Sequence, residues 1–329
     1  MITAAIINYN CGQYLGKCIE QFQKQKHLSE IIIVDDCSTD NSKEIADKYG
    51  IKWLQTPKNS GDIELPIKMI IDYVKTPYFF YLASDDWVAD DCFEILYTQI
   101  TEYEKDLVSS SIVLTDENEN ILETWNIGHK SPEEMVFHIF NSGGSGCMNP
   151  VGLHRTEFMK KVGYIRYQGV LEDTLNTLNY LKNDIRYLFV PLPLLFYRQH
   201  KTNISRNISS RVERVTATMK FVYNNFDEKI YMPQIAWEQL NDIPHFKLFM
   251  MGRIFINLFE QFASNRLPAY LKCDLSSDEL KKTAEPFLIE AQKFLQQANK
   301  NGDFQKEIEM SLDEVNLHLN AIKQLHKET

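Results

Sequence analysis

Short hydrophobic runs alternate with amphipathic helical patterns through the first two hundred residues of the chain. Runs of β-branched and aromatic residues predict strands at residues 3–8, 30–35, 51–55, 78–83, 107–114 and 187–191. Apolar residues at helical spacing between these runs predict helices at residues 15–25, 41–49, 63–74 and 87–101. Strands that alternate with helices are typical of an α/β domain, so we expect a largely parallel, Rossmann-like sheet flanked by helices.

The pattern changes after about residue 205, where strand signals disappear and only helical periodicity remains. Helices are predicted at residues 212–226, 246–263, 277–299 and 303–326, and residues 276–279 contain a capping box for the third of them. We therefore expect an α/β domain over residues 1–205 and an all-α domain over residues 206–329. The helix that begins near residue 246 is too polar to span a bilayer. It is typical of a core helix, and a role on a membrane surface or in a dimer stays open.

The composition narrows the class of protein. The chain has 329 residues, 44% of them hydrophobic, which is enough to build a globular core. Its net charge of −10 argues against a nucleic-acid binder, since such proteins neutralise phosphates with basic residues. The six cysteines form no C-x-x-C pair and the amino terminus lacks a basic leader, so we expect reduced thiols, no signal peptide and a cytoplasmic location.

Two adjacent carboxylates follow one of the predicted strands, where residues 78–83 lead into Ser84, Asp85 and Asp86. Like charges at the end of a buried strand repel each other and lose hydration, unless a cation lies between them or solvent reaches them. The pair therefore predicts either a divalent-metal site at the edge of the sheet or the start of a helix over residues 87–100. The pattern alone leaves both interpretations open.

A second acidic pair, Asp35 and Asp36, follows the predicted strand at residues 30–35. In open parallel sheets, ligands bind beyond the carboxyl ends of the strands, so the two acidic pairs should meet at one crevice. Asp40 suits the capping of the next helix, which leaves Asp35 and Asp36 free to accept hydrogen bonds from a base or a ribose. Tyr9 follows the first predicted strand, and we expect its ring either to stack on a nucleobase or to cover the core from a turn.

Taken together in chain order, these residues resemble the motifs of the family 2 glycosyltransferases, which are inverting enzymes that use nucleotide-diphosphate sugars. The resemblance covers roughly residues 1–205 and implies the GT-A fold, a Rossmann-like mixed sheet flanked by helices. Its matched segments are residues 8–10, 32–42, 59–61, 82–86, 162–164, 171–174 and 196–200.

The resemblance also implies roles for the matched residues. Asp36 would contact the donor base with Tyr9 packed against it, and Asp85 would lie near the ribose and diphosphate. Asp86 would hold Mn²⁺ or Mg²⁺, which bridges the donor phosphates and stabilises the leaving nucleoside diphosphate. The nucleotide-sugar site would be formed by Asn8, Tyr9, Asp36, Asn59, Ser84 and Asp85.

The pair Glu172 and Asp173 starts a predicted amphipathic helix, where carboxylates usually interact with the helix dipole. The resemblance implies that Asp173 is the general base that removes the proton of the acceptor hydroxyl. It further implies that His200 completes the metal shell or meets the phosphates, although a loop histidine is often without such a role. Three departures from the family pattern affect the phosphate contacts and the acceptor pocket: no arginine follows residues 59–61, Cys37 stands where glycine is frequent, and the helix after Asp173 lacks the tryptophan and arginine common in the family.

The resulting hypothesis is a metal-dependent hexosyltransferase of bacterial cell-surface polysaccharide biosynthesis. It would transfer sugar from a UDP-sugar to a hydroxyl of a glycan, lipid-linked or protein acceptor. Peripheral contact with the inner face of the membrane and a homodimer through the C-terminal helices are further expectations. A catalytically silent nucleotide-sugar-binding scaffold is the alternative. A receiver-like phosphoacceptor domain fits less well because a full strand and helix precede Asp35. A Rossmann dehydrogenase also fits less well, because no G-x-G-x-x-G motif follows any predicted strand of this chain.

Overall fold

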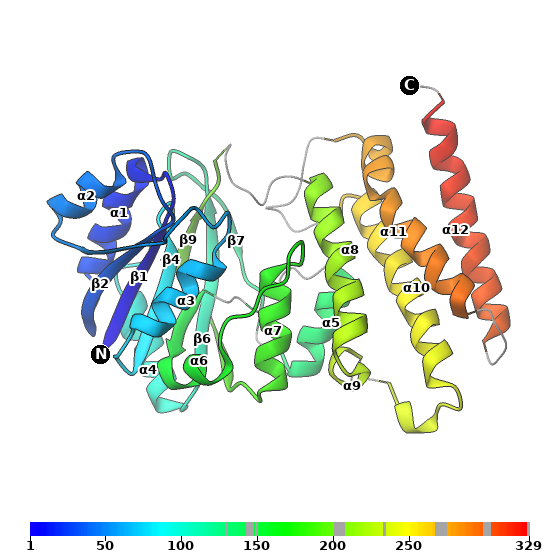
Figure 1. The fold of residues 1–329 in the computed structure, drawn as a ribbon, viewed down its shortest axis with the longest axis horizontal. Coiled ribbons are helices and arrows are strands. Elements are labelled where there is room, and N and C mark those ends of the chain that lie inside the picture. The colour runs from blue at the N-terminus through cyan, green and yellow to red at the C-terminus, as the bar shows by residue number, and fades with distance from the viewer. Residues whose placement is uncertain are drawn as a thin grey trace. The chain divides into compact units, whose positions relative to one another are not determined.

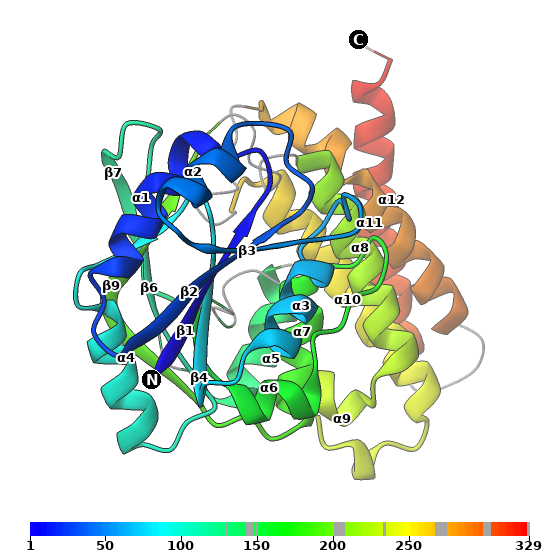
Figure 2. The ribbon, with the colours of Figure 1, turned by 60° about the vertical axis from the view of Figure 1, so that its left-hand side comes forward.

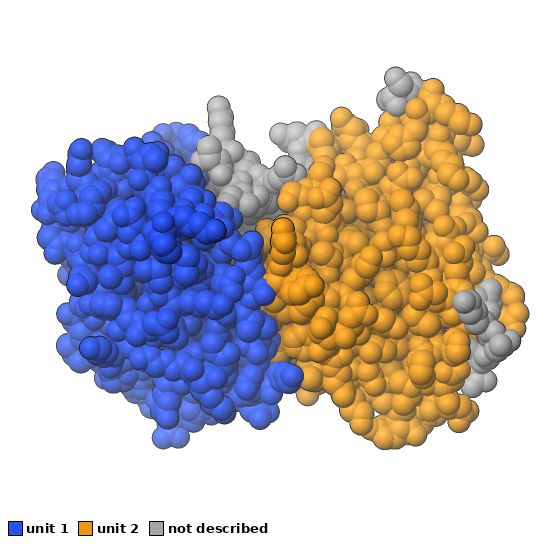
Figure 3. Space-filling model, in the orientation of Figure 1, with its two compact units in different colours: residues 1–129, 148–166, 179–202 blue, residues 130–147, 167–178, 203–329 orange. Residues whose placement is uncertain are grey.

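The chain forms two compact units in the computed structural model (Figure 3). Unit 1 comprises residues 1–129, 148–166 and 179–202, and unit 2 comprises residues 130–147, 167–178 and 203–329. The structure describes residues 1–128, 130–142, 148, 151–200, 208–232, 235–266, 275–298 and 304–327. The domain boundary predicted after residue 205 lies outside the described residues.

Within the described residues, unit 1 contains a nine-stranded mixed sheet with the order β3-β2-β1-β4-β8-β6-β9-β5, and β7 pairs with β6. Strands β3, β2, β1 and β4 are mutually parallel, as are β6 and β9, and the other pairs are antiparallel. The strands are β1 (Ile2–Asn8), β2 (Leu28–Asp35), β3 (Lys52–Gln55), β4 (Tyr78–Ala83), β5 (Trp87–Val88), β6 (Leu107–Thr115), β7 (Ile121–Trp125), β8 (Gly152–Arg155) and β9 (Tyr187–Arg198).

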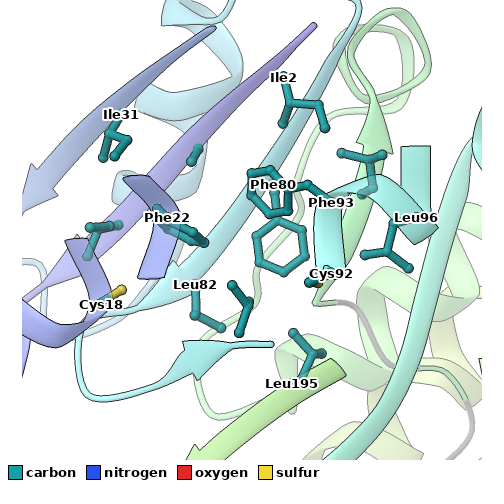
Figure 4. Packing of buried hydrophobic residues seen from close by; sticks show 14 of the residues in the cluster. Ile2, Cys18, Phe22, Ile31, Phe80, Leu82, Cys92, Phe93, Leu96 and Leu195 are labelled. Atoms are coloured by element: carbon teal, nitrogen blue, oxygen red, sulfur yellow. The ribbon is translucent and has the colours of Figure 1, made fainter. Parts of the chain in front are cut away.

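The helices of unit 1 cover both faces of the parallel strands (Figures 1 and 2). They are α1 (Gly12–Gln23), α2 (Ser42–Lys48), α3 (Glu64–Tyr73), α4 (Cys92–Glu102) and α6 (Thr156–Val162). Because side chains alternate along a strand, Ile6 and Phe80 face α1 and α4, while their neighbours in β1 and β4 face the other side. The rings of Phe22 and Phe93 lie 5.9 and 5.1 Å from Phe80 and join the two helices to the sheet (Figure 4).

The structure corrects two predicted elements of unit 1. The helix predicted at residues 87–101 begins only at Cys92, because Trp87 and Val88 form β5 opposite β9. Ser84 and Asp85 therefore do not cap a helix, and that interpretation of the acidic pair was wrong. The strand predicted to end at residue 191 continues to Arg198, because a register shift opposite Ser111 accommodates its two prolines.

Unit 2 is helical in its described part. Its helices are α5 (Pro132–Ser142), α8 (Ile208–Asn225), α9 (Glu228–Tyr231), α10 (Ile243–Ala263), α11 (Ser277–Ala298) and α12 (Gln305–Leu325), with a 3₁₀ turn η2 at Trp237–Gln239. Helix α7 (Glu172–Lys182) starts in unit 2 and ends in unit 1. Helix α11 packs on α8, α10 and α12 (Figure 1).

A glycine allows a close contact between α10 and α11. A Cβ atom placed on Gly252 of α10 would lie 2.6 Å from Cγ of Leu295 in α11, so a larger residue would require Leu295 or the helices to move. The predicted capping box is confirmed, since the Glu279 carboxylate accepts the Ser276 N–H and the Ser276 hydroxyl accepts the Glu279 N–H. Among the helices that the structure describes, none has the length and hydrophobicity needed to cross a membrane.

Candidate active site

The carboxyl edge of the parallel strands brings the predicted acidic residues together. Asn8 at the end of β1 pairs with Asp35 in β2, and Ile7 pairs with Ala83 in β4. The Asp36 N–H then donates to the Asn8 carbonyl (2.8 Å), and the Ser84 N–H donates to the Ile7 carbonyl (3.0 Å). Neighbouring strands lie about 4.8 Å apart, so the two acidic pairs flank β1 with about 10 Å between their strands. The expected common edge is confirmed.

Asn8 and Asp35 form the buried floor of this edge. The amide of Asn8 donates to the Asp35 carboxylate (2.8 Å) and to the Ser38 hydroxyl (3.0 Å), and Ser38 donates to Asp35 through its backbone and side chain. Both Asn8 and Asp35 are fully buried. The structure thus uses the side chain of Asn8, a predicted nucleotide ligand, to join the loops after β1 and β2. Tyr9, the next residue, is exposed.

Asp40 connects the starts of two helices at the same rim. Its carboxylate accepts the N–H of Gly12, the first residue of α1 (2.8 Å), and the N–H of Ser42, the first residue of α2 (3.1 Å). Partial burial opposes ionisation, but these bonds and that of the Ser42 hydroxyl outweigh it and lower the pKa of Asp40. The predicted role at the start of α2 is confirmed, and the bond to α1 was not foreseen.

Asp36 is buried and holds the loop after β3. Its carboxylate accepts the Thr56 hydroxyl (2.8 Å), the Ser60 N–H (2.9 Å) and the Ser60 hydroxyl (2.9 Å). The amide of Asn59 in this loop donates to the Asp36 carbonyl (3.2 Å), and the rest of Asn59 is exposed. Asp36 therefore fixes the position of Asn59 in the loop after β3.

The turn after β4 holds the second acidic pair. One oxygen of the buried Asp86 carboxylate accepts the Arg198 N–H of β9 (3.0 Å), and the half-buried Asp85 carboxylate contacts Nε2 of His200 (2.9 Å). Burial and the charge of Asp85 raise the pKa of Asp86 well above its ordinary value. The structure thus brings Ser84, Asp85, Asp86 and His200 together.

Arg198 organises this turn, and the sequence analysis gave it no role. Its guanidinium is buried and donates to the backbone carbonyls of Asp85 and Glu117 (3.0 Å each) and to the Glu119 carboxylate (3.1 Å). It also lies over the rings of Tyr14 and Trp87, at 4.6 and 4.7 Å from their centroids. The signal in the sequence was a single arginine at the end of an apolar strand, two residues before His200.

Asp173 lies in unit 2, at the start of α7. The neighbouring Glu172 forms an ion pair with Arg214 of α8, and the buried Leu171 N–H donates to the Thr218 hydroxyl of α8 (2.8 Å). The side chain of Asp173 is exposed in part, but the protein atoms around it and the charge of Glu172 raise its pKa. Helix α8 thus fixes the backbone that carries the predicted base.

One further cluster of metal-binding residue types occurs in unit 2. In the parts of the chain that the structure describes, only Glu260, Glu314 and His318 bring three ligand atoms within 4.8 Å of one another. Glu314 already forms an ion pair with Arg253 (2.5 Å), and such exposed groups of acidic residues commonly hold no ion. The cluster therefore does not replace the predicted site at the sheet edge.

Comparison with known proteins finds a family match in the first half of the chain. Residues 3–155 match the family model described as glycosyl transferase family 2. Over 124 residues, the chain is 35% identical to glycosyltransferase GlyG and 28% identical to glycosyltransferase GlyA, both of Streptococcus pneumoniae serotype 4. The match covers 36% of this chain in both cases, but only 41% of GlyG and 18% of GlyA.

Solved structures extend the likeness to the whole chain at the level of the fold. The crystal structure of residues 1–349 of TarS from S. aureus superposes with a TM-score of 0.57 at 16% identity, covering 100% of this chain and 92% of the TarS chain. TarS residues 1–349 in complex with UDP-GlcNAc give a TM-score of 0.55 with the same coverage. The expected GT-A-type mixed sheet followed by a helical region is therefore confirmed. In sequence, residues 3–155 are similar to glycosyl transferase family 2, and in fold the whole chain is similar to TarS.

Proposed function

We propose that this chain is an inverting glycosyltransferase that moves a sugar from a nucleotide-diphosphate donor, in particular a UDP-sugar, to a hydroxyl of a glycan, lipid-linked or protein acceptor. The observation that carries the proposal is the common edge at which Asp36 and Asp86 flank β1, in a chain whose residues 3–155 match glycosyl transferase family 2. Support for UDP as the nucleotide comes from the fold likeness to TarS, whose structure was solved with UDP-GlcNAc.

The residue types at the turn after β4 suit a divalent cation, although the ligand atoms of Asp85, Asp86 and His200 do not all lie within 4.8 Å of one another. The two adjacent carboxylates and the imidazole of His200 offer the oxygen and nitrogen ligands that Mn²⁺ accepts, and the carboxylates alone suit Mg²⁺. Burial next to Asp85 disfavours the charged form of Asp86, and a cation would remove that penalty. Asp86 and His200 would hold the ion, with Asp85 beside the ribose and diphosphate. A bound ion neutralises the charge that develops on the departing diphosphate.

The chemistry of transfer then depends on Asp173. Its carboxylate takes the proton of the acceptor hydroxyl while that oxygen forms a bond to the anomeric carbon of the sugar. The bond between this carbon and the phosphate oxygen breaks, and its electron pair leaves with the nucleoside diphosphate. A single displacement of this kind inverts the anomeric configuration. The raised pKa of Asp173 suits a general base, which must hold a proton after removing it.

Two substitutions test the proposal with a panel of UDP-sugars, measured with and without Mn²⁺. We expect Asp173→Asn to lower turnover by about 10²- to 10⁴-fold while the affinity for the donor is unchanged. Asp86→Asn should abolish the Mn²⁺-dependent part of UDP binding. Asp90→Asn is the matched control, because this nearby carboxylate is exposed and should leave both quantities unchanged.

The same measurements separate the alternatives. Transfer at the wild-type rate in Asp173→Asn would remove Asp173 as the base. Nucleotide binding by the wild-type chain without release of UDP from any sugar donor would favour the silent scaffold. Absence of nucleotide binding would overturn the proposal as a whole.

A further inference from the structure

Unit 2 contains a groove along α8 that is separate from the residues discussed above. Its volume is about 470 Å³, and it is bounded by α8, by Pro286 of α11 and by Tyr167, which precedes α7. Sites for small molecules commonly have volumes of this size. All of its lining residues belong to unit 2, so the groove is a feature of that unit alone.

An exposed aromatic ring forms one wall of the groove. Tyr167 is 55% exposed, and its ring centroid lies 4.3 Å from that of Phe221 in α8. The Val170 N–H donates to the Tyr167 carbonyl (3.0 Å), which closes a turn behind the ring. A ring that is supported in this way offers a firm apolar surface with a polar hydroxyl at its edge. The C–H face of a sugar ring is complementary to such a surface.

The rest of the lining combines the apolar Ala217 and Pro286 with polar side chains. Both Thr216 and Asn224 line the groove: the Thr216 hydroxyl donates to the Val212 carbonyl (2.8 Å) and so offers its oxygen as an acceptor, whereas the Asn224 amide can both donate and accept. Asn225 and Glu213 lie near the two ends of this lining. Sugar hydroxyls both donate and accept, so a lining of this mixed kind suits them.

The charges of the groove argue against an anionic ligand. Lys220 is the basic residue of the lining, and it forms an ion pair with Glu290 (3.2 Å), which also binds Lys293 (2.8 Å). Glu290 is 9% exposed, and although burial opposes ionisation, the two lysines lower its pKa, so its negative charge holds Lys220 in place. The remaining charged residue of the lining is the acidic Glu213. A phosphate would find no spare cation here, whereas a neutral sugar needs none.

The groove lies along α8, the helix that contacts the start of α7, where the predicted base Asp173 is found. Arg214 and Thr218 of α8 bind Glu172 and the Leu171 N–H at the start of α7, and Tyr167 precedes α7 in the chain. We propose that this groove binds a neutral oligosaccharide segment of the acceptor. This inference rests on the proposed function, because it names the acceptor class for the same transfer reaction.

The test is binding of defined oligosaccharides to the full chain, followed by saturation-transfer NMR and calorimetry. The neutral probes are tri- and tetrasaccharides of glucose, mannose, galactose and N-acetylglucosamine, and the anionic probe is a short poly(glycerol phosphate). We expect at least one neutral probe to bind, and Tyr167→Ala to weaken that binding about tenfold or more, since stacking on the ring is lost. Tyr167→Phe should retain it to within about twofold.

Tyr103→Ala is the matched control, because Tyr103 is 53% exposed and lies in unit 1. It should leave oligosaccharide binding unchanged, and UDP-sugar affinity should be the same in all three variants. The inference is overturned if no neutral probe binds at millimolar concentration, if Tyr167→Ala binds as the wild type does, or if the anionic probe binds better in a Tyr167-dependent manner. Failure of UDP-sugar binding would instead overturn the proposed function and leave the groove result standing.

Discussion

Replacing Asp36 by asparagine should loosen the loop after β3, because one carboxylate accepts three hydrogen bonds from it. The Thr56 and Ser60 hydroxyls bond to different oxygens of the carboxylate, so in asparagine one of them can still donate to the amide oxygen while the other rotates and accepts from the amide nitrogen. The Ser60 N–H can only donate, and in the variant it donates to a neutral amide oxygen instead of a charged carboxylate. A hydrogen bond to a charged group contributes about 1.5–3 kcal/mol, and we expect Asp36→Asn to lower the free energy of unfolding by that amount.

Two measurements check this prediction. Urea unfolding gives the change in the free energy of unfolding, and hydrogen exchange followed by mass spectrometry shows whether the loss is local. The backbone amides of residues 56–61 should exchange faster in Asp36→Asn, while those of β1 change less. Thr56→Val should cost about 1 kcal/mol, and its effect should not add fully to that of Asp36→Asn because the two side chains share a bond.

The control is Asp47→Asn on α2, where the carboxylate is exposed and pairs only with Lys43 of the same helix. This change should alter stability by no more than about 0.5 kcal/mol. The reasoning is refuted if Asp36→Asn and Asp47→Asn give the same unfolding free energy and the same exchange in residues 56–61. The hydrogen bonds of Asp36 to Thr56 and Ser60 would then not stabilise the loop after β3.

Two further predictions concern the base and the helical unit. The protein atoms around Asp173 and the charge of Glu172 raise the pKa of its carboxyl group, so the loss of transfer at low pH should begin at a higher pH than an ordinary aspartate would give. Glu172→Gln should move this limb of the kcat/KM profile to lower pH, and a profile that does not move would contradict the assignment. Gly252→Ala should destabilise the chain by about 1–3 kcal/mol because of the contact with Leu295, whereas Gly16→Ala in α1 has room and should stabilise it by up to about 1 kcal/mol. Urea unfolding of both variants checks this, and equal shifts would refute the packing argument.

Most of the parallel half of the sheet could be predicted from the sequence because β1, β2 and β4 each contain a continuous hydrophobic run. Strand β4 was predicted at its observed bounds, and β1 and β2 within two residues. The short antiparallel strands β5, β7 and β8 were missed, because two to five residues carry little periodic signal and their pairing is decided by other strands.

The acidic residues of the site could be predicted for the same reason, since they follow hydrophobic runs that end at one edge. Their partners could not. Arg198 reaches Asp85 and Glu119 across 113 and 79 positions of the chain, and no local pattern reports such contacts. Asn8 and Asp36 were expected to face a ligand, but hydrogen bonds to Asp35 and Ser60 occupy much of their side chains, and this competition appears only once the loops are folded.

The bonds of Asp40 to the first residues of both α1 and α2 have a consequence for affinity. They tie the segments after β1 and β2 to each other before any ligand arrives, so the conformational entropy of these segments is lost during folding. A molecule that binds at this rim meets a preorganised surface, and more of its interaction energy remains as net affinity.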